Sequence, residues 1–150
     1  QNKNIPLYVR SFLDFQSPST VIGNFGALSY PEIKIVENNQ CLVKISPKDF
    51  SFVSENHLKI IFGILDELKI KVFVMRNTAL HFLFSTNNES DKLDRFNELL
   101  NNTFDIVLEK NLKLITIRHE VNSFYSKEGN KIIFEEKFDK TRHLLFKNEK

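Results

Sequence analysis

The clearest pattern of hydrophobic and polar positions lies in residues 41–109. Cys41, Val43 and Ile45 alternate with less apolar neighbours, which predicts a half-buried strand. After a polar loop, Ser54 is well placed to cap a helix. Gly63 inside this helix predicts close helix packing rather than a ligand contact, because glycine costs about 1 kcal/mol there relative to alanine. The helix itself is predicted from apolar residues at spacings of three and four: Leu58, Ile61, Leu65 and Leu68.

The rest of this central stretch predicts two further strands, a helix and a final strand. Alternating apolar residues mark strands at 72–75 and 80–84, with a short turn between them. Residues 91–101 form an amphipathic pattern, and residues 104–108 alternate again. The order strand-helix-strand-strand-helix-strand is that of a ferredoxin-like α+β domain, a four-stranded antiparallel sheet with both helices on one face.

The two flanks of this unit are rich in strands and nearly without helices. Short strands are expected at 5–12 and 33–36 before it, and at 112–119, 131–138 and 142–147 after it, with a loop or single turn at 122–129. Isolated ribbons of this length are only marginally stable. We therefore expect both flanks to meet in one second sheet, with the strand at 5–12 packed against residues 112–147 and the central unit inserted between them.

Composition and charge exclude several classes of protein. The 150 residues are 41% hydrophobic, with 15 Phe and no Trp, which suits one core or two small ones. The net charge is +2 with Lys and Glu interspersed, whereas a nucleic-acid surface needs a basic stripe. No apolar run approaches the roughly 20 residues of a membrane span. The chain begins with Gln1 and shows no signal peptide, so we expect a cytoplasmic piece of a longer protein.

No catalytic or metal-binding constellation is predicted. The single cysteine, Cys41, lies in an expected core strand and is interpreted as a small hydrophobic residue. The four histidines lack the spacing of metal ligands, and Glu135 and Glu136 point to opposite faces of a strand. No glycine-rich phosphate loop is present in the sequence.

A binding site for a small molecule is the chemistry that the central unit offers. The loop after the first strand leads into a helix N-terminus, where free N–H groups and the helix dipole attract a carboxylate. From the residues alone, an ordinary helix cap and turn is the preferred interpretation. The candidate site comprises the loop, the first helical turn and the strand at 73–80: Ser46, Asp49, Phe52, Val53, Ser54, Glu55, Asn56, Phe73, Met75, Asn77, Thr78 and Ala79.

Several segments together resemble the regulatory region of bacterial aspartate kinases, in the form of Bacteroidetes enzymes. They are IPLYVRSFLDFQSPSTVIGN, FGILDELKIKVFVMRNTALHF, LKLITIRH and KIIFEEK, in the family's order and spacing. The chain departs from the family at Ser19, where glycine usually precedes Thr20, and in the short segment after His119. The resemblance implies a complete ACT domain at 41–109, inserted into an abbreviated second ACT-like, β-rich unit formed by 5–40 plus 110–147, with 1–4 as a remnant of the junction to the kinase domain.

The resemblance also implies a function. An amino acid of the lysine or threonine class would bind between two ACT domains and inhibit the phosphorylation of aspartate by ATP and Mg²⁺ in a kinase domain absent here. The chain would form a homodimer through its first ACT domain and would itself need no cofactor. Lysine-sensitive members carry acidic residues at the positions aligned with Phe73 and Ala79, so threonine suits this site better.

The alternative is a ferredoxin-like module that binds RNA or another protein and has no small-molecule effector. RNA-binding domains of this fold stack bases on aromatic residues of exposed central strands. The matching segment here, LHFLFST, has no glycine and no flanking Lys or Arg. The effector-binding interpretation is therefore preferred.

Overall fold

The computed structural model describes residues 5–23, 30–120 and 131–147. The chain divides into two units, residues 1–31 and 32–150. In the first, strands β1 (Leu7–Val9) and β2 (Thr20–Ile22) form a two-stranded antiparallel sheet, so the strand expected at 5–12 is three residues long. Its expected packing against residues 112–147, and the inserted arrangement of the domains, stay predictions. The expectations for 1–4 and 122–129 lie outside the described residues.

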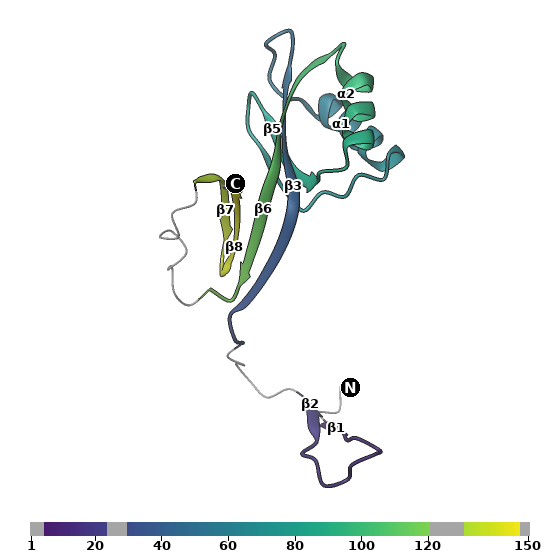
Figure 1. The fold of residues 1–150 in the computed structure, drawn as a ribbon, viewed down its shortest axis with the longest axis vertical. Coiled ribbons are helices and arrows are strands. Elements are labelled where there is room, and N and C mark those ends of the chain that lie inside the picture. The colour runs from purple at the N-terminus through teal and green to yellow at the C-terminus, as the bar shows by residue number, and fades with distance from the viewer. Residues whose placement is uncertain (1–4, 24–29, 121–130, 148–150) are drawn as a thin grey trace. The chain divides into compact units, whose positions relative to one another are not determined.

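The second unit is a six-stranded antiparallel sheet with two helices (Figure 1). The sheet order is β4-β5-β3-β6-β8-β7. Both helices lie on the same side of the sheet, so the predicted βαββαβ order and α+β class are confirmed. Among the described residues, no helix is both long and apolar enough to cross a membrane. The elements are β3 (Ile33–Pro47), α1 (Glu55–Glu67), β4 (Val74–Asn77), β5 (Phe82–Asn87), α2 (Ser90–Leu100), β6 (Phe104–Arg118), β7 (Ile132–Phe138) and β8 (Thr141–Lys147).

Strands β3 and β6 are 15 residues long, and each joins two segments that the sequence predicts as separate strands. The register of their pairing shifts on both sides of Gln40. Asn39 and Asn111 adopt positive φ angles of 53° and 61°, which asparagine tolerates better than most residues. The polar segments are thus irregularities within strands and not loops. Residues 33–37 of one flank pair with 114–118 of the other, but they extend the central sheet instead of forming a separate one.

The main core lies between the sheet and the two helices. Phe84 of β5 and Phe96 of α2 are fully buried, and their rings meet edge to face at 5.9 Å. The alternating apolar residues from which the strands were predicted face the helices. The buried residues of this core are Cys41, Val43, Ile45, Ile61, Leu65, Phe82, Phe84, Leu93, Phe96, Leu100 and Phe104.

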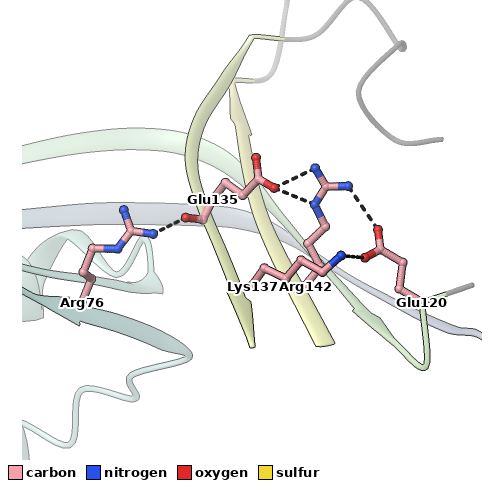
Figure 2. A network of polar contacts seen from close by, with 5 residues as sticks. All are labelled: Arg76, Glu120, Glu135, Lys137 and Arg142. Carbon is pink, nitrogen blue, oxygen red and sulfur yellow. Dashed lines mark hydrogen bonds and ion pairs between the residues drawn. The ribbon is translucent and has the colours of Figure 1, made fainter. Parts of the chain in front are cut away.

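A second apolar cluster, which we call the inner cluster, covers the opposite face of the sheet. It contains Val74 of β4 and Phe134 of β7, which stand at the two ends of the strand order. The sheet is therefore curled, so that its two edge strands approach each other. Figure 2 shows this approach, with Arg76 of β4 pointing to the Glu135 carbonyl on β7. The inner cluster comprises Leu42, Val74, Leu112, Leu114, Phe134 and Leu145.

Gly63 does not serve helix packing. It lies on the exposed side of α1, and a Cβ atom built there would meet no other atom within 4 Å. The prediction of a close contact at Gly63 is therefore wrong.

We expect Gly63→Ala to stabilise the protein by about 0.5–1 kcal/mol, because alanine is the better helix former and the added methyl group meets open space. Urea unfolding followed by circular dichroism measures the change. A loss of stability would show that Gly63 has a packing role.

Cys41 is fully buried in the main core, as predicted. Burial raises the pKa of its thiol to about 11. The reactive thiolate is therefore scarce at neutral pH.

We expect Cys41 to resist iodoacetamide in the native protein at about pH 8, near the ordinary thiol pKa, and to react after unfolding in guanidinium. Mass spectrometry of the intact chain counts the adduct, and no second cysteine complicates it. Rapid labelling of the native protein would contradict the burial of this strand.

Candidate functional site

The loop after β3 and the turn between β4 and β5 lie against each other. The Val53 N–H donates to the Ala79 carbonyl at 2.8 Å. At the end of β3, the Ser46 hydroxyl and Nδ1 of His81 are 2.8 Å apart. The first contact brings the loop, the turn and the start of α1 together. The second lies on the other face of the sheet, because Ser46 and His81 are each next to a residue of the main core, Ile45 and Phe82.

Helix α1 begins with a capping box in which histidine takes the place usually held by Glu or Gln. The His57 N–H donates to the Ser54 hydroxyl at 3.4 Å, and the Ser54 N–H donates to Nδ1 of His57 at 3.3 Å. Nδ1 must be unprotonated to accept, so this geometry requires the neutral ring. Within the described residues, the N–H groups of Glu55 and Asn56 donate to no acceptor, and both residues are exposed.

The loop carries one carboxylate, that of Asp49. It accepts a hydrogen bond from the Ser51 N–H at 3.0 Å, the geometry of an Asx turn. The Ser51 side chain first, and then this N–H, lower the pKa of Asp49. Asp49 thus stays ionised while it organises the loop. Phe50 and Phe52 beside it are 92% and 70% exposed.

The predicted residues on β4 and beside it do not all face the candidate site. Met75 and Asn77 lie on the helix side of β4, since Met75 is paired with Phe84 of the main core. The Thr78 hydroxyl donates to the His81 carbonyl and accepts from the His81 N–H, so it is occupied within the turn. Phe73 packs against the inner cluster on the opposite face, and the structure does not bring it to the loop.

His57 belongs to the site although the sequence interpretation assigned it a structural or surface role, whereas His81 contacts Ser46 on the opposite face of the sheet. The signal for His57 is its position three residues after a capping Ser54. His81 offers no such signal, because its contact with Ser46 joins residues 35 apart in the chain.

A cavity lies at the other end of α1. It has a volume of about 470 Å³ and is lined by Phe62, Leu65, Asp66 and residues 69–72. None of the predicted site residues lines it. Within residues 5–23, 30–120 and 131–147, no three His, Cys, Asp or Glu side chains gather as a metal site requires. The chemistry available at the candidate site is therefore anion binding by two N–H groups at a helix N-terminus.

Comparison with known proteins adds the identity of the fold. No family model matches the chain, and no curated protein matches it in sequence. Solved structures do. A structure described as the C-terminal regulatory domain of aspartate kinase from Porphyromonas gingivalis W83 matches with a TM-score of 0.67 and 13% identity, over 78% of this chain and 86% of that one.

Complete aspartate kinases match as well. The Clostridium acetobutylicum enzyme has a TM-score of 0.69 and 14% identity, over 97% of this chain and 39% of that one. E. coli aspartokinase III with lysine and aspartate has a TM-score of 0.61 and 18% identity, over 95% of this chain and 35% of that one. The chain thus spans little more than a third of these enzymes. Its fold is the ACT-domain fold of aspartate kinase regulatory domains.

Proposed function

We propose that this chain is the allosteric regulatory region of an aspartate kinase and binds an amino acid at the start of α1. The observation that carries the proposal is the pair of N–H groups, of Glu55 and Asn56, that point from a helix N-terminus next to the β4–β5 turn. They suit the α-carboxylate of an amino acid. The shared fold supports the proposal, as does the E. coli structure with its bound lysine and aspartate. ATP and Mg²⁺ would act in the kinase domain of the parent protein.

Threonine suits the proposed site better than lysine. The turn presents no carboxylate, because Ala79 has none and its carbonyl accepts from Val53. An ammonium group held without a charged partner loses about 1.5–3 kcal/mol. Asp49 and Glu55 are the acidic side chains close enough in the chain to replace it, and Asp49 is already engaged with Ser51.

RNA binding is disfavoured by the same structure. Phe82 and Phe84, the aromatic residues of β5, are buried under the helices. The opposite face of the sheet, on which a ferredoxin-like domain would stack bases, is closed by the inner cluster.

The carboxylate contact is tested by Glu55→Pro. Proline fits the first position of a helix and removes the N–H, and Ser54 before it already has the extended backbone that proline requires (φ −97°, ψ 169°). Glu55→Gln is the matched control, since it removes the charge and keeps the N–H. We expect calorimetry with threonine to show binding by Glu55→Gln and at least about tenfold weaker binding by Glu55→Pro, the loss of one hydrogen bond to a charged group.

Equal affinities of the two variants would contradict the placement of the carboxylate. Tighter binding of lysine than of threonine that survives both Asp49→Asn and Glu55→Gln would contradict the choice of effector class. Absence of binding by any protein amino acid would contradict the proposed function.

A dimer is part of the proposal. β4 is an edge strand, and edge strands are normally covered or paired. Large apolar side chains are exposed on β4 and on the flank of α1 that faces β5: Met75 at 53% and Phe62 at 41%. Side-by-side pairing of two copies would cover both the edge and these side chains.

We expect light scattering to give twice the chain mass of 17.6 kDa at tens of micromolar. Met75→Lys places a charge on this edge and should give the monomer mass, whereas Leu99→Lys on α2 is the control and should leave the dimer intact. A monomeric parent protein, or dissociation by Leu99→Lys and not by Met75→Lys, would contradict this interface.

A further inference from the structure

Arg76 occupies the middle of β4, between two residues of the candidate site. Met75 and Asn77 lie on the helix side of the strand, so Arg76 points to the opposite face. Its cross-strand partner, Leu83, packs against the inner cluster. One four-residue strand therefore forms a wall of the proposed site with one side and carries Arg76 on the other.

The guanidinium group of Arg76 makes three kinds of contact with β7. It forms an ion pair with the Glu136 carboxylate, to which its Nε donates at 2.6 Å, and it also donates to the Glu135 carbonyl. It lies 4.5 Å above the ring of Phe134. The planar guanidinium can bind and stack at once, which a lysine ammonium group cannot do. These contacts join the two edge strands of the curled sheet.

The hairpin of β7 and β8 is itself firmly held, so it can act as an anchor. The Glu135 carboxylate accepts from Arg142 at 2.7 Å, and Arg142 donates to Glu120 at 3.1 Å (Figure 2). A hydrogen bond from Lys137 lowers the pKa of Glu120. The side chains of Arg142 and Glu120 are only 11% and 4% exposed, and breaking an ion pair that is largely buried is costly.

Apart from Arg76, the strand β4 is held by its pairing with β5 and by Val74 in the inner cluster. It is four residues long and pairs with β5 on one side only. It leads directly into the turn whose Ala79 carbonyl accepts from the Val53 N–H in the loop after β3. A shift of β4 would therefore move that turn and the contact between turn and loop.

We infer that Arg76 is a positioning residue of the proposed effector site, which holds β4 and the following turn in place by binding them to the β7–β8 hairpin. The inference rests on the proposed function for its biological meaning. Its geometric content does not depend on an effector, because the Val53 and Thr78 amides report on the loop and the turn in the free protein. Because Arg76 connects them, a displacement of the β7–β8 hairpin would also displace β4 and the site. The C-terminal strands could regulate the site by this route.

Amide hydrogen exchange followed by NMR tests the inference. Arg76→Met keeps an apolar stem over Phe134 and removes the charge, and Glu136→Gln weakens the same ion pair from the other side. Arg95→Met is the control, since it breaks the exposed pair with Glu98 on α2. We expect exchange of the Val53 and Thr78 amides to accelerate about tenfold in Arg76→Met and less in Glu136→Gln, without change in Arg95→Met.

The Phe96 amide of α2 separates a local effect from a general loss of stability, which would accelerate all slow amides alike. Exchange at Val53 and Thr78 that is unchanged in Arg76→Met, or that accelerates only as much as at Phe96, overturns the inference. Should Arg76→Met fail to fold, Glu136→Gln is judged by the same criterion. Because no amino acid is added, a failure to bind one would count against the proposed function and not against this result.

Discussion

The pairing of β3 with β6 is the interaction on which the rest of residues 32–150 depends. Both strands run for 15 residues, and every other strand of the sheet is attached to one of them, β5 and then β4 to β3, and β8 and then β7 to β6. The helices close one face of this ladder. The other face is closed by the curl of the sheet itself, which brings β7 to β4 and buries the inner cluster.

This arrangement links the proposed site to the C-terminal hairpin by two routes. One route runs through the paired strands from β4 across β5, β3 and β6 to β8. The other is Arg76, which binds the hairpin directly. Allosteric regulation requires that a ligand contact two states of the protein differently, with a coupling of about 1–3 kcal/mol in typical cases. A short edge strand that would form a wall of the proposed site on one side and that forms an ion pair on the other is well suited to such coupling.

The local elements could be predicted from the sequence because each follows a hydrophobic period. Residues 41–45 and 104–108 alternate, α1 and α2 repeat every three to four residues, and Ser54 marks where α1 begins. The joins within β3 and β6 could not be predicted, because a bulge at Asn39 or Asn111 interrupts the pattern as a loop does. The curl of the sheet could not be predicted either, because the contact between Arg76 and Glu136 joins residues 60 apart in the chain. Of the candidate site, the loop and helix start were predictable, whereas the faces taken by Ser46 and Phe73 depend on tertiary pairing.

The proposed function requires that an amino acid bind through its carboxylate at the start of α1. The most direct measurement is a titration of the ¹⁵N-labelled chain with threonine, followed by its amide resonances. We expect the largest shifts at Glu55 and Asn56, whose N–H groups would receive the carboxylate, with smaller shifts in the turn at Thr78 and Ala79. Shifts confined to residues 69–72 beside the cavity at the other end of α1, or no shifts at all, would contradict it.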